Sequence, residues 1–365
     1  MDEIKKFFEC LIPVTVCNIK CDYCYIVQRE QRTCKIPELK YSPQVMEKAL
    51  TQERLGGVCY FSICGAGETF VSDYLLDIVA AMLNNGHYVN ITTNGTLTTK
   101  IEKLKRFNPE ELSRILISFS FHYLELMKRN LIETFFCNIN YVRNLGCSII
   151  VQVNMYDGYL PYLEEIKKLC LENVGALPQI AATRKEESLT SKVEFHTKFS
   201  DEEYANYGKQ FCSPLFDFTV QNFKKKRKEF CYAGSWTYSL NLQTGILKRC
   251  YASCIYQNIF KNTNSPLMDL AVGNHCGSLF CMNSSHFISL GCIPEITAPT
   301  YSGLRNRKQA GWFSETMKHF LDSKLYESNE EYSKIKKAKS NFIGVLDNFI
   351  YNTYQATKFR KKKSK

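Results

Sequence analysis

Short apolar runs alternate with longer amphipathic patterns through the first half of the chain, and this alternation is the strongest constraint on the fold. Several runs are apolar at nearly every position, as strands covered on both faces are. Six such runs separated by five helical patterns predict a parallel sheet with right-handed crossovers. The strands are expected at residues 11–16, 58–63, 88–93, 115–121, 148–154 and 176–182, and the helices at 43–55, 72–85, 98–107, 124–145 and 160–173.

Local signals support two of these helices. Ser42 followed by Pro43 is typical of a helix start, because serine caps the first turn and proline fits its first position. Gly146 is typical of a helix end, since glycine readily adopts the left-handed conformation found there. The first and fourth helices are therefore expected to begin and end at these points.

The pattern changes after residue 184. Residues 185–230 are more polar and are interpreted as a bridge, whereas cysteines, glycines and short apolar pieces dominate from 231 to 297. Helical spacing returns near residue 310 and ends in a basic tail. We expect a core domain at 1–184, a bridge at 185–230, a small cysteine-rich domain at 231–297 and a helical segment at 298–365.

Composition indicates the compartment. The chain has 365 residues, enough for a large domain and a smaller one. No apolar run reaches the ~18 residues needed to span a membrane, and the start of the chain lacks the apolar core of a secretory signal. Seventeen cysteines in such a chain favour metal binding or redox chemistry over disulfides. We expect a cytoplasmic protein with no membrane partner.

The formal net charge is +11, and much of the excess comes from two runs, at residues 224–228 and 358–365. Neither run interleaves aromatic and basic residues as recognisable nucleic-acid-binding modules do. Both are interpreted as solvated, with a transient acidic partner as the alternative for the tail. Nucleic acid is therefore not expected as a partner.

Three cysteines lie close together just after the first predicted strand. Cys17, Cys21 and Cys24 are separated by three and then two residues. A 4Fe–4S cluster normally takes four thiolates, so three would leave one iron without a protein ligand and open for chemistry. The alternatives are a zinc site, which usually has a fourth Cys or His nearby, and three unrelated buried thiols.

The spacing of these cysteines resembles that of the radical S-adenosylmethionine (SAM) superfamily. Tyr23 stands where the family usually has an aromatic residue near the adenine. After the second strand, Gly65-Ala66-Gly67-Glu68 resembles the family motif that receives the methionine amino group, although Thr69 replaces the usual proline. Glycines let the backbone approach a ligand, and a carboxylate offsets an ammonium.

Further polar residues stand where parallel strands end, which is where ligand contacts gather in such folds. The third strand ends in Thr93-Asn94-Gly95, as it often does in the family. By resemblance, Ser120 and Asn154 would face the ribose or carboxylate of the cofactor, and Arg184 could pair with its carboxylate. The alternative for each is a polar strand end without a ligand.

A second group of cysteines lies in the C-terminal half. Cys231, Gly245 and Cys250 are spaced as at the start of the SPASM and twitch domains, which bind auxiliary clusters in many radical SAM enzymes. The intervening segment predicts a hairpin turning at residues 243–245. Cys276 and Cys281 could complete four ligands. The spacing departs from the full SPASM pattern, so a twitch-like domain with one auxiliary cluster is expected.

Alternatives remain for this second group. Possible substitute or extra ligands are Cys254, Cys292, His275 and His286. A structural zinc ion or unligated thiols are the other interpretations. Nearby, Arg305 and Arg307 beside Tyr301 could bind an acidic substrate group, or could instead belong to a packed helix entry. The remaining cysteines show no ligand spacing, and most of them are expected to be small buried hydrophobes.

The resemblance implies a fold and a reaction. The fold would be α/β, an incomplete (β/α)6 TIM-like barrel with a small cysteine-rich domain beside it. A reductant such as flavodoxin or ferredoxin would supply one electron, and reductive cleavage of SAM would give a 5′-deoxyadenosyl radical that takes a hydrogen atom from the substrate. The substrate is expected to be a peptide or protein. The alternatives are a small-molecule dehydrogenase acting on an amino sugar or alcohol, and a non-enzymatic, zinc-stabilised nucleic-acid-binding protein.

Overall fold

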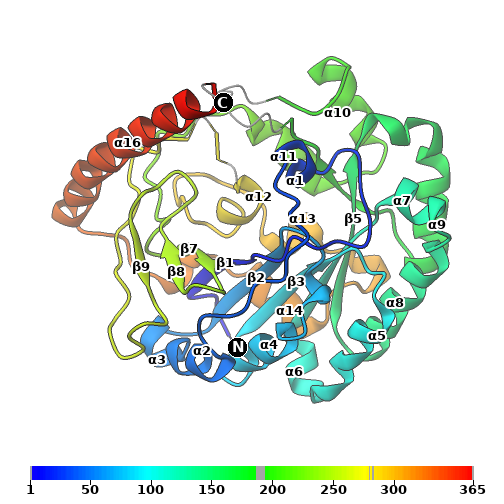
Figure 1. Cartoon of the computed structure of the whole chain (residues 1–365), viewed down its shortest axis with the longest axis horizontal. Coiled ribbons are helices and arrows are strands. Elements are labelled where there is room, and N and C mark those ends of the chain that lie inside the picture. Colours follow the sequence, from blue (N-terminus) through cyan, green and yellow to red (C-terminus); the bar gives the residue numbers. More distant parts are fainter. Residues whose placement is uncertain (1, 186–193, 279, 282, 364–365) are drawn as a thin grey trace.

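The computed structural model describes residues 2–185, 194–278, 280, 281 and 283–363, and it is built around one curved sheet (Figure 1). The order of strands in the sheet is β6-β5-β4-β3-β2-β1-β7-β8-β9. Each of the first six strands pairs in parallel with its neighbour in the chain. The strands are β1 (Lys6–Ile12), β2 (Cys59–Gly65), β3 (Tyr88–Thr93), β4 (Ile115–Ser120), β5 (Ser148–Met155), β6 (Gln179–Ala182), β7 (Thr237–Asn241), β8 (Ile246–Lys248) and β9 (Tyr256–Asn258).

Helices connect the parallel strands and cover the outer face of the sheet, as Figure 1 shows for α4, α5, α8 and α9. Those of the first half are α1 (Tyr25–Gln28), α2 (Pro43–Ala49), α3 (Gln52–Leu55), α4 (Leu75–Leu83), α5 (Thr98–Ile101), α6 (Pro109–Ser113), α7 (Tyr123–Lys128), α8 (Ile132–Asn144) and α9 (Leu163–Val174), with 3₁₀ turns η1 (Thr69–Val71), η2 (Glu102–Arg106) and η3 (Asp157–Tyr162). The arrangement confirms the predicted partial (β/α)6 barrel, which stays open because β6 and β9 are the two edges of the sheet.

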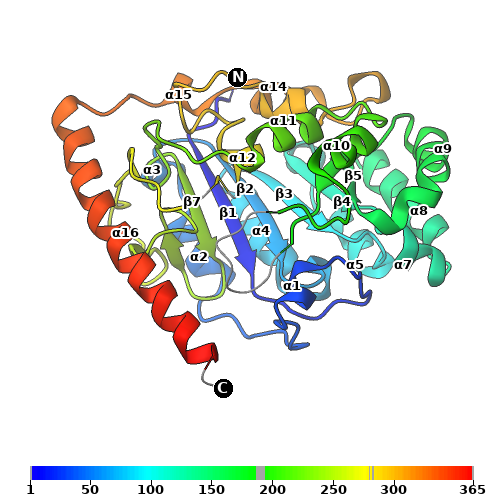
Figure 2. The same cartoon turned by 90° about the horizontal axis from the view of Figure 1, so that it is seen from above.

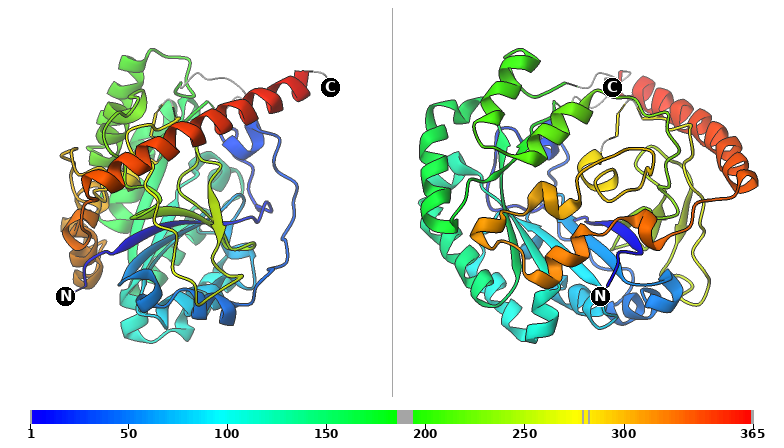
Figure 3. Two further views of the ribbon diagram at one scale, coloured as in Figure 1. Left: turned by 90° about the vertical axis from the view of Figure 1, so that its left-hand side faces the viewer. Right: turned by 180° about the vertical axis from the view of Figure 1, so that it is seen from behind.

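The C-terminal half adds mainly helices. They are α10 (Asp201–Lys209), α11 (Pro214–Phe223), α12 (Ser284–Phe287), α13 (Tyr301–Arg305), α14 (Glu315–Asp322), α15 (Leu325–Ser328) and α16 (Lys334–Lys363), with the 3₁₀ turn η4 (Lys308–Ala310). The orange helices lie at the amino-terminal ends of the strands, whereas α16 projects along one side of the molecule (Figures 2 and 3). Within the described residues, no helix is both long enough and apolar enough to span a bilayer.

The first strand differs from its prediction. It was expected at 11–16, but it occupies Lys6–Ile12 and ends immediately before Pro13. Proline has no backbone N–H and therefore cannot continue the hydrogen-bonded ladder. The residues that follow instead form the loop that carries the first three cysteines.

Two predicted helices are interrupted. The pattern at 43–55 gives α2 and α3, because the Thr51 side chain accepts a hydrogen bond from the Arg54 N–H and starts a new helix. The pattern at 124–145 breaks at Asn130, whose φ of 56° is left-handed. Asparagine is one of the few residues that tolerates this conformation. The predicted cap at Ser42 and the glycine after α8 are both confirmed.

The cysteine-rich region continues the main sheet. β7 pairs in parallel with β1, and β8 pairs antiparallel with β7, which confirms the predicted hairpin around Gly245. The sheet therefore runs across the expected boundary between residues 184 and 231, and the division into domains stays a prediction.

Candidate active site

The loop after β1 brings Cys17, Cys21 and Cys24 together at the carboxyl ends of the strands. Arg32 fastens this loop, because its guanidinium donates to the carbonyls of Cys17, at 2.5 Å, and Ile19, at 2.8 Å. Cys24 is the N-cap of α1, and its N–H donates to the Cys21 carbonyl at 3.2 Å. The short spacing therefore folds into a compact turn that ends in a helix.

The three thiols share one small space. Burial raises the pKa of Cys21, and the next causes are the negative charges that Cys17 and Cys24 would carry as thiolates. Burial is also the main reason that the pKa of Cys17 is raised. Three thiolates this close repel one another unless a cation lies between them. The donor set therefore fits an iron–sulfur group, whose positive irons would remove the repulsion.

The glycine-rich segment after β2 lies directly against this loop. The Gly67 N–H donates to the Val14 carbonyl at 2.6 Å, and the Glu68 N–H donates to the Val16 carbonyl at 2.8 Å. A Cβ atom on Gly67 would lie 2.1 Å from the Val16 carbonyl oxygen, which is impossible without moving backbone. Glycine is thus required here, while Gly65 and Ala66 lead the chain from β2 into the contact.

Glu68 is 2% exposed, and its carboxylate is surrounded by hydrogen-bond donors of the protein. Its carboxylate accepts hydrogen bonds from the Thr93 hydroxyl at 2.6 Å, the Asn94 N–H at 2.7 Å and the Phe70 N–H at 3.0 Å. Burial raises the pKa of Glu68, and these three donors oppose the rise. A carboxylate offers about four acceptor positions, so one remains for an ammonium group.

Asn94 ties the end of β3 to the cysteine loop. Its side-chain amide donates to the Asn18 side chain at 2.8 Å and lies 3.8 Å from the Cys17 sulfur. Gly95 follows with a φ of 71°, and a Cβ there would lie 2.8 Å from the ring of Phe119. The Thr93-Asn94-Gly95 motif therefore connects Cys17 and Glu68 in one hydrogen-bond network.

Tyr23 points into an aromatic cluster. Its hydroxyl lies 2.6 Å from His122 Nδ1 and 2.9 Å from the Tyr159 hydroxyl, and its ring centre is 5.0 Å from that of Tyr156. Burial raises the pKa of Tyr23, and the Asn154 side chain, which hydrogen-bonds to its hydroxyl, opposes the rise. The structure thus joins two predicted site residues, Tyr23 and Asn154, beside the cysteine loop.

Ser120 and Arg184 are placed differently. Ser120 is half-buried at the end of β4 and pairs with Gln152 of β5. The positive charge of Arg184 lowers the pKa of Glu9 and of Tyr25. Its cofactor role stays a prediction.

Glu9 was missed by the sequence analysis. It lies half-buried on β1, and its carboxylate accepts hydrogen bonds from the Asn283 side chain and the Tyr251 hydroxyl. The signal that could have identified it is the acidic residue within the strand KFFECLI. It was not considered because the predicted strand began five residues after the observed one. Tyr251 follows Cys250 in the chain, so Glu9 lies on the side of the second cysteine group.

The free energy of unfolding should depend on the protonation state of Glu9. Burial raises its pKa from 4.5 to about 7. A carboxyl group whose folded pKa is raised stabilises the fold fully below pH 4.5, and this contribution is lost as the pH rises through 7. We expect the free energy of unfolding to fall by on the order of 3 kcal/mol over this window, and Glu9→Gln to remove most of that fall. Urea unfolding at pH 5 and pH 8 measures it.

The exposed Glu53 provides the matched control for this experiment. Glu53→Gln should retain the wild-type pH dependence, because it leaves Glu9 and its hydrogen-bond partners in place. Equal pH dependence in wild type and Glu9→Gln would show that Glu9 titrates as an ordinary exposed acid.

The second cysteine group gathers around the β7–β8 hairpin. The pKa of Cys250 is raised first by burial and then by the charges of Cys276, Cys231 and Cys281. The pKa of Cys281 is raised by burial and by the charges of Cys231 and Cys276. The four cysteines therefore face one region, and their role as cluster ligands stays a prediction.

Cys292 is a fifth thiol in this region. Its sulfur lies 4.0 Å from that of Cys231 and 3.4 Å from the Thr237 hydroxyl, and it is fully buried. The hydrogen bond to Cys292 is the largest cause of the raised pKa of Cys231. Cys292 is therefore placed to substitute for one of the four predicted cysteine ligands. The backbone N–H of Cys254, the other proposed substitute, donates to Asp347 of α16.

Among the residues that the structure describes, no group of three Cys, His, Asp or Glu side chains is arranged to hold a single metal ion.

Other candidates from the sequence have structural partners. His286 lies 5.7 Å from Phe7 and 5.5 Å from Tyr301, centre to centre, and burial lowers its pKa. Arg305 donates to the Ser285 carbonyl and stacks on Tyr301. The guanidinium of Arg307 donates to backbone carbonyls of Leu177, Pro178, Phe211 and Cys212. These arginines therefore support the packed-helix interpretation.

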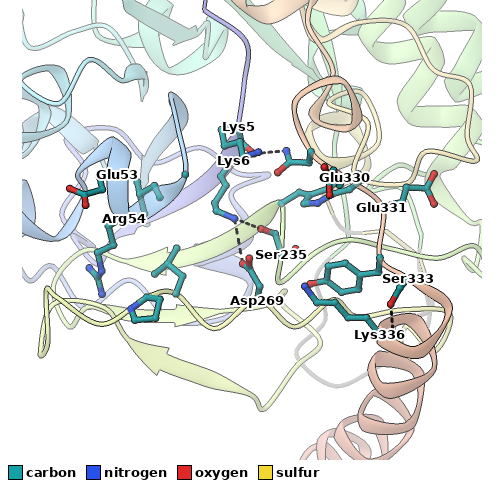
Figure 4. Close-up of a pocket in the computed structure, with 17 residues that line it drawn as sticks. Lys5, Lys6, Glu53, Arg54, Ser235, Asp269, Glu330, Glu331, Ser333 and Lys336 are labelled. Carbon is teal, nitrogen blue, oxygen red and sulfur yellow. Dashed lines mark hydrogen bonds and ion pairs between the residues drawn. The ribbon is translucent and has the colours of Figure 1, made fainter.

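A cavity of about 490 Å³ lies at the other end of β1 (Figure 4). Lys6, in its wall, donates to the Ser235 carbonyl at 2.9 Å and lies 3.4 Å from Asp269. β1 starts at Lys6 and the cysteine loop follows its opposite end. In barrels of this kind the chemistry is at the carboxyl ends of the strands, so this cavity is separate from the candidate active site.

Comparison with known proteins gives one family and several distant structures. SuiB from Streptococcus suis bound to S-adenosylmethionine has a TM-score of 0.48 at 17% identity, over 72% of this chain and 67% of that one. The same protein bound to its precursor peptide SuiA has a TM-score of 0.47 at 18% identity, over 72% and 64%. Native anSMEcpe with bound AdoMet and Cp18Cys peptide has 0.46 at 13%, over 96% and 99%.

No curated protein sequence matches the chain. Residues 11–170, however, match the family model described as the radical SAM superfamily. This range begins within β1 and includes the three-cysteine loop, the glycine-rich segment and the Asn94 network. Residues 11–170 of the chain are therefore similar to the radical SAM superfamily.

Proposed function

We propose that this enzyme uses S-adenosylmethionine and a 4Fe–4S cluster to make a 5′-deoxyadenosyl radical, and that the radical takes a hydrogen atom from a peptide or protein. The observation that carries the proposal is the contact between the three-thiol loop and the glycine-rich segment. Backbone hydrogen bonds from Gly67 and Glu68 to that loop place the buried carboxylate of Glu68 beside the thiols.

Each residue then has a role at the site. Cys17, Cys21 and Cys24 would hold the cluster, which supplies the electron that cleaves the cofactor. Glu68 would accept the amino group of the methionine moiety in its remaining acceptor position. Because Gly67 has no side chain, the backbone of the cysteine loop can pack closely against it. Asn94 contacts both Cys17 and Glu68 and so fixes their relative position. Tyr23, Asn154 and Ser120 would lie toward the nucleoside.

An auxiliary cluster is the second part of the proposal. Cys231, Cys250, Cys276 and Cys281 would hold it, with Cys292 as the alternative to one of them. Their spacing resembles that of SPASM and twitch domains, and many enzymes with such domains modify peptides. Two of the similar structures contain peptides, as their descriptions state.

The hydrogen-bonded Glu9 favours a second candidate, a dehydrogenase for an amino sugar or alcohol. A half-buried carboxylate with Tyr251 and Asn283 could bind the amine or hydroxyl of a small substrate. The match of residues 11–170 to a superfamily of enzymes opposes the non-enzymatic zinc protein. All 17 cysteines are free, which suits a reducing compartment and supports a cytoplasmic location.

Anaerobic purification followed by iron, sulfide and 5′-deoxyadenosine measurements tests the proposal. We expect about eight irons per chain and deoxyadenosine formation with dithionite and S-adenosylmethionine. Candidate peptides and amino sugars are then compared by the deoxyadenosine formed and by substrate mass. Iron without deoxyadenosine would reject the reaction, and oxidation of amino sugars alone would select the dehydrogenase.

A further inference from the structure

The long helix α16 turns its apolar side chains toward solvent. Ile335 is 85% exposed, Phe342 69% and Phe349 72%, and Val345 and Leu346 between them are each half exposed. Seven of the sixteen large exposed hydrophobic residues in the described part of the chain lie on this helix. A contiguous apolar surface of this kind marks an interaction site.

The opposite face of α16 is polar and packs against the protein, which is the reverse of an ordinary surface helix. Ser340, Gly344 and Asp347 are buried at spacings of four and three residues. A Cβ on Gly344 would lie 2.8 Å from the Val272 carbonyl oxygen, so the helix backbone packs closely. The orientation of the apolar stripe is therefore fixed by the packing of the helix.

Hydrogen bonds from α16 fasten it to the loops of the second cysteine group. Asp347 accepts from the Ser253 hydroxyl at 2.6 Å and from the Cys254 N–H at 2.8 Å. Asn341 accepts from the Asn274 N–H at 2.9 Å, and Asn348 donates to the His275 carbonyl. A partner bound to the exposed face of α16 would thus lie across the helix from residues 250–254 and 274–277.

The apolar stripe has the spacing of a coiled-coil seam. Ile335, Phe342 and Phe349 are separated by seven residues each, and Val345 lies three residues after Phe342. Apolar residues that repeat in this way pair with a second helix. The seam predicts a helical partner rather than an extended strand or an irregular loop.

The charge of this segment selects the kind of partner. Residues 334–365 contain nine lysines and one arginine against one acid, so they contribute +9 of the net charge of +11. That acid, Asp347, is 2% exposed and paired with Arg249. Lys334, Lys336 and Lys339 of α16 are exposed, so the described surface of the helix is cationic and apolar, and its complement is acidic and apolar.

Other occupants fit less well. A second copy would bring two segments of +9 together, and like charges beside a coiled-coil seam oppose pairing. Nucleic acid would meet the lysines but leave the apolar stripe uncovered. Helices that lie in a lipid surface carry their lysines on the face opposite the apolar one, whereas here that face packs against the protein body.

We propose that α16 is a docking helix that binds an acidic amphipathic helix of another polypeptide through the seam of Ile335, Phe342, Val345 and Phe349. The lysines near residues 334–339 steer the acidic partner, and the apolar seam holds it. The proposal concerns this surface alone and does not depend on the reaction catalysed.

The probe is a fluorescent 21-residue peptide with leucine at the two seam positions of each heptad and glutamate beside them, titrated into the purified full-length enzyme. We expect binding that weakens with added salt, and at least about tenfold weaker binding to the Phe342→Ser/Phe349→Ser variant because both central anchors are lost. Leu171→Ser, which replaces a half-exposed residue of α9, is the matched control and should bind as wild type does.

Four further measurements complete the test. The same peptide with lysine in place of glutamate should not bind, and thermal unfolding should show that both serine variants are folded. Equal affinity of wild type and the double variant for the acidic peptide would overturn the proposal. It would also be overturned by a wild-type dimer that the double variant abolishes, or by seam-dependent binding to phosphatidylglycerol vesicles without binding to the peptide.

Discussion

Cys21→Ser is expected to lower the iron content from about eight to about four atoms per chain and to bring 5′-deoxyadenosine formation to background. Cys21 is the most informative of the three, because the charges of both Cys17 and Cys24 act on its thiol. A serine hydroxyl is a poor ligand for iron compared with the soft thiolate. Two remaining thiolates could not hold a cluster that is already one ligand short of four.

Cys34→Ser is the matched control, since Cys34 is the next cysteine in the chain and is exposed. It should retain wild-type iron and deoxyadenosine. The Cys250→Ser variant should also lose about four irons but retain the three-cysteine loop, so deoxyadenosine formation without substrate should persist. Full iron and activity in Cys21→Ser would remove the loop from the active site.

The sheet was predictable because its strands are buried on both faces, and such strands are apolar at nearly every position. β2 to β6 lie within a few residues of their predicted positions. β1 was displaced because its prediction began at Leu11 and included Pro13, which the ladder cannot accept. The interruption at Asn130 was missed because helical periodicity continues through the break.

The candidate site was predictable where its chemistry depends on short spacings. The loop of Cys17, Cys21 and Cys24 and the segment ending at Glu68 each occupy a few consecutive residues, and the parallel sheet brings their loops to one edge. Glu9 and Cys292 could not be assigned in this way. Their partners are 242 and 61 residues away, in Tyr251 and Cys231, so only the folded chain brings these groups together.

A single buried ion pair connects the auxiliary cysteine loops to α16, and Asp347→Ala is expected to lower the free energy of unfolding by about 3–5 kcal/mol. Asp347 Oδ2 lies 2.5 Å from the Arg249 guanidinium, and the two side chains are 2% and 4% exposed. Removal of the carboxylate leaves the Arg249 charge buried, with only the Ala271 carbonyl and the Ser253 hydroxyl as described partners. The Cys254 N–H loses its acceptor as well.

Urea unfolding at low and high salt distinguishes this pair from an exposed one. Asp77→Ala, which removes the half-exposed partner of Arg106, should cost less than about 1 kcal/mol, and salt should reduce that cost. The cost of Asp347→Ala should depend little on salt, because a buried pair is poorly screened. Replacing both partners, in Arg249→Met/Asp347→Leu, should recover most of the loss, since the penalty comes from the unpaired charge. A cost below about 1 kcal/mol for Asp347→Ala would mean that water reaches Arg249 and that α16 is held mainly by its amide contacts at Asn341 and Asn348.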